Sequence, residues 1–335
     1  MDGINSELIK AGGHMTRKML VTLFNKIITT EKTPKDWSNM IITPIYKKGD
    51  KLKPENYRAI SLLSIPGKTF CKMLIKRSSQ KIEEVMSESQ FGFRPGRGTV
   101  DAIFVIRQII EKAKEHNVPL HFNFIDFNAA FDTIWREALW KILLHIGIQH
   151  KVVSIIKNMY EDTKCAVQIG GELTDSFPVN VGVRQGCVMS PTLFNIYLDY
   201  VMKEIKSLDN QFRLTDNMSI DIRYADDTTL VSAIFEKLQL ATTELETACN
   251  KWGLKINPTK CAVISRERKD ITIENEVVPK VKEFKFLGSL VPECTRDVSH
   301  RIAMASRAFN RLRSEIWTSR RISKKLKTRL YKALI

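Results

Sequence analysis

The segment that most constrains this fold is residues 220–231, where two adjacent aspartates interrupt a run of strand-forming residues. The residues on either side of Ala225, Asp226 and Asp227 alternate between apolar and polar or are β-branched, which predicts two short strands joined by a tight turn. Two like charges at the tip of a hairpin repel each other, and aspartate does not favour strands. The segment therefore predicts a cation at the turn, although an isolated Asp-Asp pair would ordinarily be interpreted as a solvated turn.

A third carboxylate ends another predicted strand. Residues 120–126 alternate, and one face carries Phe122, Phe124 and then Asp126. A carboxylate that continues the apolar face of a strand destabilises the core unless it has a partner. Asp126 is therefore a candidate ligand, with helix capping as the alternative interpretation.

Composition indicates the kind of partner. The chain has 335 residues and is 43% hydrophobic, which suits one elaborate domain or two to three packed subdomains. The net charge of +16 favours a polyanion, namely nucleic acid ahead of an acidic membrane surface. No apolar run is long enough to span a bilayer. The six cysteines show no CxxC spacing, which argues against a zinc site and predicts an intracellular, reducing location.

Two further segments are candidates for contact with a phosphorylated ligand. A predicted hairpin near residues 40–61 carries Lys47, Lys48 and Arg58, which would present cations to a phosphate. A solvated basic hairpin is the alternative interpretation. Gln185 and Gly186 precede a predicted helix and leave backbone accessible near its positive end.

Two segments have a composition typical of nucleic-acid contact. Residues 90–98 interleave glycines, aromatics and arginines, which fits either a nucleic-acid strand or an ordinary packed loop. Residues 298–335 are predicted to be helical and strongly basic, with Glu315 as nearly their only acid, so we expect contact with a phosphate backbone. Their apolar residues form one predicted seam: Val298, Ile302, Ala305, Phe309, Leu312 and Ile316.

The three carboxylates together predict a metal site. In an antiparallel sheet, Asp126 can lie beside the tip that carries Asp226 and Asp227. A site with oxygen ligands and no histidine or thiolate suits magnesium. Two such ions about 3.5–4 Å apart would activate a hydroxyl and stabilise a leaving phosphate oxygen. The predicted reaction is nucleotidyl transfer to a primer 3′-hydroxyl.

The order of these motifs resembles a known family. The motifs that carry the resemblance occur in the family's order along the chain. They are residues 44–50, 57–61, 90–94, 124–132 and 184–191, then the box Tyr224-Ala225-Asp226-Asp227, and after it residues 253–260 and 286–288. Over nearly the whole chain, this order resembles the reverse transcriptase of a non-LTR, LINE-like retrotransposon. The resemblance implies an α+β right-hand polymerase of fingers, palm and thumb, with an antiparallel palm sheet backed by helices. It places the fingers at residues 1–118, the palm with interleaved fingers segments at 119–295, and a partial basic thumb at 296–335.

The resemblance also implies roles for individual residues. Asp126, Asp226 and Asp227, with the carbonyl of Phe127, would hold two Mg²⁺ ions, with Mn²⁺ as an alternative. The expected nucleotide-binding residues are Lys47 or Lys48, Arg58, Phe131, Gln185, Gly186 and Lys260. Among these, Phe131 resembles the aromatic gate that selects deoxynucleotides, and Lys260 the lysine near the leaving pyrophosphate. A primer grip is expected at Phe286, Leu287 and Gly288.

The implied partners are an RNA template, a DNA primer and deoxynucleoside triphosphates. The family usually adds an endonuclease and often a Cys/His nucleic-acid-binding module, and neither occurs in this sequence, which predicts a fragment or a degenerate copy of a longer polyprotein. One alternative is a nucleic-acid-binding remnant without catalysis. The other is a reverse transcriptase of the group II intron maturase type, which shares the residue 224–227 box but would carry a maturase extension after the thumb.

Overall fold

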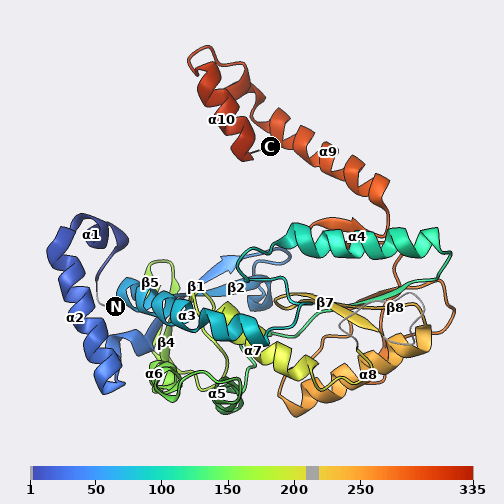
Figure 1. Ribbon diagram of the computed structural model, residues 1–335. Helices are drawn as coiled ribbons and strands as arrows, with labels where there is room; N and C mark the ends of the chain where they lie inside the picture. The colour runs from blue at the N-terminus through green and yellow to red at the C-terminus, as the bar shows by residue number, and fades with distance from the viewer. Residues whose placement is uncertain (1–2, 209–218, 335) are drawn as a thin grey trace.

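The computed structural model describes residues 3–208 and 219–334 (Figure 1). At its centre lies an antiparallel sheet in the order β7-β8-β3-β9. Its strands are β3 (His121–Ile125), β7 (Ile220–Tyr224), β8 (Asp227–Ser232) and β9 (Ala262–Ile264). Ile125 pairs with Thr228, so the end of β3 lies beside the beginning of β8. The predicted hairpin and its neighbouring strand are confirmed.

Helices cover the two faces of this sheet (Figure 1). On one face, Phe122 and Phe124 are buried with residues of α4 (Thr99–Glu115). The opposite face packs on α8 (Phe235–Lys251), where the Asn123 amide donates a hydrogen bond of 3.0 Å to the Thr242 hydroxyl. The strict alternation of β3 therefore produces the two faces that its sequence predicts.

A second sheet carries the basic hairpin. Its order is β2-β1-β4-β5, with β6 also paired to β4. The strands are β1 (Asn39–Tyr46), β2 (Tyr57–Leu62), β4 (Lys164–Ile169), β5 (Glu172–Leu173) and β6 (Phe177–Pro178). A short helix precedes each of the first two strands: η1 (Lys35–Ser38) comes before β1, and η2 (Pro54–Asn56) comes before β2. Lys47 and Lys48 lie in the connection between β1 and β2, and Arg58 pairs with Ile45 across the two strands.

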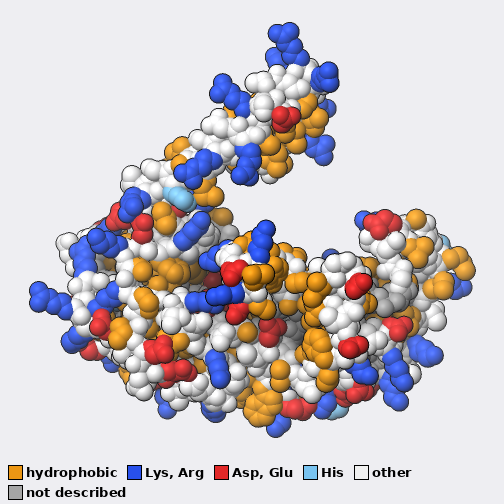
Figure 2. Space-filling model, turned by 180° about the vertical axis from the view of Figure 1, so that it is seen from behind, with side chains coloured by type: hydrophobic (Ala, Val, Ile, Leu, Met, Phe, Trp, Pro, Cys, Tyr) orange, Lys and Arg blue, Asp and Glu red, His pale blue; other side chains and the backbone are white. Residues whose placement is uncertain are grey.

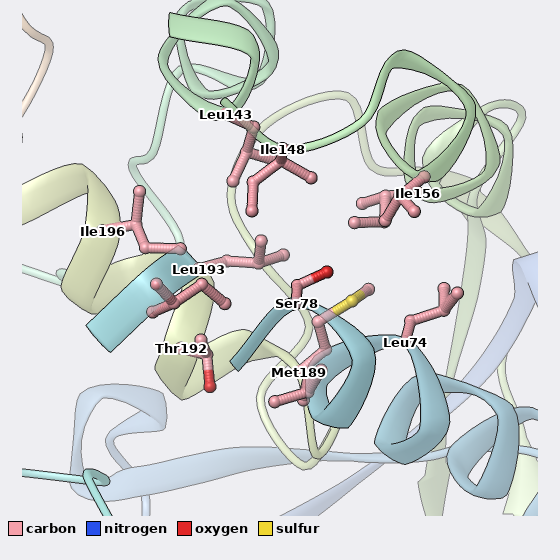
Figure 3. A pocket seen from close by; sticks show the side chains of 12 residues that line it. Leu74, Ser78, Leu143, Ile148, Ile156, Met189, Thr192, Leu193 and Ile196 are labelled. Carbon is pink, nitrogen blue, oxygen red and sulfur yellow. The ribbon is translucent and has the colours of Figure 1, made fainter. Parts of the chain in front are cut away.

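Among the remaining helices of the body, α7 (Ser190–Met202) is buried along most of its length, whereas α1 (Ser6–Ala11) and α2 (Gly13–Thr30) lie at the edge of the molecule (Figure 1). The others are α3 (Ile65–Val85), α5 (Arg136–His145) and α6 (His150–Tyr160). Where α3, α5, α6 and α7 meet, an apolar crevice lined by residues such as Leu74, Leu143 and Leu193 encloses about 20 Å³ (Figure 3). That volume is close to one water molecule, so the crevice is a packing gap rather than a substrate site.

The C-terminal segment forms an arm that rises from the body (Figure 1). We define the arm as α9 (Cys294–Arg311), the π-helical turn η3 (Arg313–Trp317) and α10 (Lys324–Leu334). Just before it lie the small hairpins of β10 (Thr272–Ile273) with β11 (Glu276–Val277), and of β12 (Phe284–Phe286) with β13 (Ser289–Val291). None of the helices in the described ranges combines the length and apolarity that a membrane span requires.

The predicted apolar seam of the arm is covered only toward its tip. The rings of Phe309 and Trp317 stack with centroids 5.0 Å apart, and Tyr331 of α10 packs edge-on against both. Val298 and Ile302, at the base of α9, are 56% and 62% exposed. The base of the seam is therefore exposed to solvent.

Candidate active site

The two acidic segments meet at one edge of the central sheet. Tyr224 pairs with Asp227, so Ala225 and Asp226 form a two-residue turn between β7 and β8. Ala225 has a φ of 57°, the left-handed conformation that such a hairpin turn needs at its first central residue. Because Ile125 pairs with Thr228, Asp126 follows directly beside Asp227. The fold thus brings Asp126 beside a pair of acids that lies 100 residues later in the sequence.

The carboxylates influence one another electrostatically. Burial raises the pKa of Asp227 to about 6, and the negative charges of Asp226 and Asp126 add to the effect. Burial also raises the pKa of Asp126, which Lys260 partly opposes and Asp226 reinforces. Burial, with a smaller contribution from neighbouring acids at Asp126 and Asp227, therefore disfavours the charged forms, which a nearby cation would stabilise.

The oxygen-only character of this group fits a hard divalent cation. Within residues 3–208 and 219–334, no three His, Cys, Asp or Glu side chains are close enough together to hold one ion. The three aspartates are therefore within electrostatic range of each other without forming a closed ligand cage.

The backbone around Asp126 is held by residues 255–261. The carbonyl of Asp126 accepts a hydrogen bond of 2.8 Å from the Asn257 amide, and Asn128 donates one of 2.8 Å to the Lys255 carbonyl. These bonds flank the antiparallel bridge between Phe127 and Ile256 and do not use the Phe127 carbonyl. The same segment brings the charge of Lys260 to Asp126. Residues 255–261 therefore both pair with the backbone next to Asp126 and bring Lys260 within electrostatic range of its carboxylate.

The hairpin tip rests on residues 90–92. The side-chain oxygen of Gln90, which is fully buried, accepts hydrogen bonds from the amides of Ala225 at 3.0 Å and Gly92 at 2.9 Å. A Cβ on Gly92 would lie 2.5 Å from the Ala225 nitrogen, so only glycine allows this approach. This part of the loop supports the turn, as the packed-loop interpretation expects, whereas Phe93 is 57% exposed.

A buried ion cluster lies behind the tip. Arg223 of β7, which is 1% exposed, contacts Asp199 of α7 at 3.0 Å and Asp221 at 2.6 Å. Breaking such a pair would leave an uncompensated buried charge, so the cluster fixes β7 against α7. Sequence reasoning missed Gln90, Asp199 and Arg223. For Arg223 and Asp199, the available signal was a charged side chain among the apolar residues of a strand and of a helix.

The β1–β2 connection places cations near the acids. The charge of Lys47 lowers the pKa of Asp126, Asp226 and Asp132 against the larger effect of burial, and Arg58 acts in the same way on Asp226. Of the two lysines that sequence reasoning left open, Lys47 is the one whose charge acts on these carboxylates.

The Gln185–Gly186 turn is docked on β2 beside this hairpin. The Ser61 amide donates a hydrogen bond of 2.7 Å to the Gln185 carbonyl. Gly186 has a φ of 103°, and a Cβ there would lie 2.7 Å from the Ser61 carbonyl oxygen. The side-chain amide of Gln185 donates a hydrogen bond of 2.9 Å to the Asp132 carboxylate. Both residues are therefore fixed by protein contacts.

Phe131 lies on the segment that follows Asp126. Its ring stacks on Phe194 of α7 with centroids 4.7 Å apart, and its carbonyl accepts a hydrogen bond of 2.7 Å from Val183. The side chain is only partly buried, so part of it remains accessible to solvent.

The predicted primer grip is a two-residue turn. Leu287 and Gly288 connect β12 to β13, and both have positive φ, 47° and 85°. Phe286 is 3% exposed and lies 6.0 Å from the Phe124 ring. The Phe286 side chain therefore anchors the turn to the central sheet, which leaves Leu287 and Gly288 at its tip.

Comparison with known proteins identifies the family. Residues 45–291 match the family model described as reverse transcriptase (RNA-dependent DNA polymerase). This chain belongs to the reverse transcriptase family. Members of the family generally use divalent metal ions, which agrees with the oxygen-only group of acids.

Several curated relatives are polymerases of mobile elements. The chain is 25% identical to a probable RNA-directed DNA polymerase from transposon BS of Drosophila melanogaster, over 96% of this chain and 37% of that protein. It is 24% identical to the RNA-directed DNA polymerase from mobile element jockey of Drosophila funebris, over 94% of this chain and 36% of that protein. The chain thus spans little more than a third of these relatives, and the predicted resemblance to a retrotransposon reverse transcriptase is confirmed.

Solved structures support the predicted fold. Apo telomerase from Candida tropicalis, truncated from its C-terminal domain, matches with a TM-score of 0.56 and 16% identity, covering 82% of this chain and 58% of that one. Telomerase from Candida albicans in complex with a fragment of telomeric RNA matches with a TM-score of 0.55 and 12% identity, covering 82% and 48%. The α+β right-hand polymerase architecture is therefore confirmed.

Proposed function

We propose that this reverse transcriptase chain catalyses RNA-directed DNA synthesis for a retrotransposon. One observation carries the proposal: Asp126 and the Asp226–Asp227 turn share one sheet edge, beside the cations of the β1–β2 hairpin. Its substrates are a DNA primer on an RNA template and deoxynucleoside triphosphates. The mobile-element origin of the relatives favours this proposal over an intron maturase.

Asp126, Asp226 and Asp227, with the Phe127 carbonyl, would hold two Mg²⁺ ions, with Mn²⁺ as an alternative. When bound, divalent ions would lower the pKa of the primer hydroxyl and neutralise negative charge on the phosphates. The protein's own contribution is to hold the three carboxylates in place. Asn257, Cys261 and Gln90 do this by fixing the backbone at both acidic segments.

The nucleotide would lie between the two sheets. Lys47 and Arg58 bind and orient its triphosphate, because their positive charges act on Asp226. Lys260 holds a proton beside Asp126 for the leaving pyrophosphate. Gln185 and Gly186, fixed on Ser61 and Asp132, position the nucleotide base. Leu287 and Gly288 hold the primer end.

Phe131 would exclude ribonucleotides by contact with the 2′-hydroxyl. Stacking on Phe194 restricts movement of the Phe131 ring away from the nucleotide. We expect Phe131→Ala to raise ribonucleotide incorporation relative to deoxynucleotide incorporation by about tenfold or more. Unchanged discrimination in a competition assay would remove this role.

The domain assignment follows the same proposal. Residues 1–118 form the fingers, residues 119–295 the palm with its interleaved fingers segments, and residues 296–335 a partial thumb. The basic arm would follow the template–primer duplex beyond the open concavity below it (Figure 2). The relatives' greater length is consistent with further endonuclease or nucleic-acid-binding modules in the full protein.

Primer extension tests the proposal. We expect the chain to extend a DNA primer on an RNA template when Mg²⁺ and deoxynucleoside triphosphates are present, and extension to stop when the ion is chelated. Asp226→Asn is the matched control, because it keeps the turn and removes one charge. Binding of the template–primer without extension at any Mg²⁺ or Mn²⁺ concentration would instead support an inactive remnant.

A further inference from the structure

One buried carboxylate connects three separate elements at the base of the arm. Asp297, in the first turn of α9, is 6% exposed. It accepts hydrogen bonds from Arg107 of α4 at 3.1 Å, the Ser289 hydroxyl at 2.9 Å, the Leu290 amide at 2.8 Å and Arg301 at 3.1 Å. These donors belong to α4, β13 and α9, so a single side chain holds the arm, the β12–β13 hairpin and the sheet-covering helix together.

The donors reinforce one another around Asp297. Arg107 also donates to the Ser289 hydroxyl at 2.8 Å and to the Leu290 carbonyl at 2.9 Å. Arg301 reaches back to the Gly288 carbonyl at 3.3 Å. The cluster thus extends to the turn that we assign to the primer. Burial alone would raise the pKa of Asp297, but the hydrogen bonds from Leu290, Ser289 and Arg301 lower it, so the carboxylate is ionised at neutral pH.

The rest of α9 offers little alternative attachment. Val298 and Ile302, the next apolar residues of the helix, are more than half exposed. In Figure 1 the helix leaves the body directly after its first turns. The direction of the arm is therefore set mainly by the contacts of this first turn, and a small rotation there would displace α10 by a much larger distance.

We propose that Asp297 is a positioning residue that couples the orientation of the arm to the Leu287–Gly288 turn, so that grip on the primer end and contact with the duplex are set together. This inference rests on the proposed polymerase function. The donors to Asp297 lie outside the turn and the strand end that carry Asp126, Asp226 and Asp227. Asp297 therefore acts on how long the nucleic acid stays bound and not on the chemical step.

Loss of the carboxylate charge should loosen this junction. In Asp297→Asn the side chain keeps its size, but Arg107 and Arg301 face each other without a compensating charge. The control is Asp270→Asn, which causes the same change in net charge at an exposed ion pair with Lys280, 2.8 Å apart. Any general effect of added positive charge on nucleic-acid binding appears in both variants.

The experiment measures two rates for each variant. The first is the dissociation rate of a fluorescent RNA–DNA template–primer without nucleotides, which needs no catalysis. The second is the single-turnover rate of primers already bound. We expect Asp297→Asn to dissociate about tenfold faster, with the single-turnover rate within about twofold of wild type, and Asp270→Asn to change neither rate more than about twofold.

A milder variant and a double-mutant cycle keep the proposal open to refutation. Ser289→Ala removes one hydrogen bond without changing charge, and we expect dissociation about threefold faster. The double variant Asp297→Asn with Arg107→Gln should lose less binding free energy than the sum of the losses in the two single variants, because both substitutions break the same contact. Unchanged dissociation in Asp297→Asn, or equal losses in both rates, would overturn the proposal. Absence of extension by the wild type would refute only the polymerase function, since dissociation is measured independently.

Discussion

The sheet edge that carries the three acids and the C-terminal arm differ most in how their backbones are held. At the acidic edge, Asp126 is fixed through Asn257 and the Ala225 turn through buried Gln90. The arm has exposed apolar residues near its base and depends on the junction at Asp297. Under the proposed function, the chemistry that needs accurate placement would lie on the element with many backbone contacts, and contact with a nucleic-acid duplex would fall to the less anchored arm.

The largest effect should separate the two regions completely. We expect Asp126→Asn to lower primer extension by at least ~10³-fold, because one of the three charges that would hold the metal ions is lost. Template–primer dissociation should stay within about twofold of wild type. Asp175→Asn, at an exposed loop position, serves as the control. Substantial extension by Asp126→Asn would show that the acidic edge is not the catalytic centre.

The support of the hairpin tip should matter almost as much. Gln90→Met keeps the side-chain volume but leaves the amides of Ala225 and Gly92 without their acceptor. We expect a loss of about 2 kcal/mol in the free energy of unfolding and about 10²-fold in single-turnover extension. Gln108→Met, at a half-buried position of α4 whose side chain bonds to Glu111 in the same helix, is the matched control for denaturation and kinetics. If both variants behave alike, the tip does not depend on this contact.

Charge on the arm should change binding without changing chemistry. We expect Arg320→Gln combined with Arg321→Gln to weaken template–primer affinity about tenfold and to make its dependence on salt shallower by about two phosphate contacts. The control pair, Lys112→Gln with Lys269→Gln, removes the same charge from exposed ion pairs elsewhere. A fall in the single-turnover rate at saturating template–primer would contradict the division between the two regions.

The smallest expected effect concerns stability and pH. Because the pKa of Asp227 is raised to about 6, its charged form destabilises the fold, and this cost grows as pH rises from about 4 to 6. Without divalent ions, Asp227→Asn should therefore raise the melting temperature at pH 7.5 by about a few degrees, and less at pH 5. Thermal unfolding in a chelating buffer measures the difference. A melting temperature lowered at pH 7.5 would reverse the assigned sign.

Sequence periodicity was sufficient to predict the acidic edge. A period of two places Phe122, Phe124 and Asp126 on one face, and the turn residues limit how β7 and β8 can pair. Periodicity could not identify Gln90 or Asp297, because their roles depend on partners contributed by distant elements. It also could not choose between Lys47 and Lys48, since loop geometry decides which lysine faces the acids.

The arm shows the opposite limit of sequence reasoning. Its helices and basic character were predictable from local pattern. The apolar stripe was also predictable, but the exposure of Val298 and Ile302 was not, because the sequence pattern of one helix does not reveal whether a second surface covers it.

The central claim is that Asp126, Asp226 and Asp227 jointly bind divalent ions. Titration of the protein with Mn²⁺, followed by the electron paramagnetic resonance signal of the free ion, tests it without any need for catalysis. The account predicts uptake by the wild type and at least about tenfold weaker uptake in each of Asp126→Asn, Asp226→Asn and Asp227→Asn. Uptake by Asp126→Asn as tight as that of the wild type would contradict it.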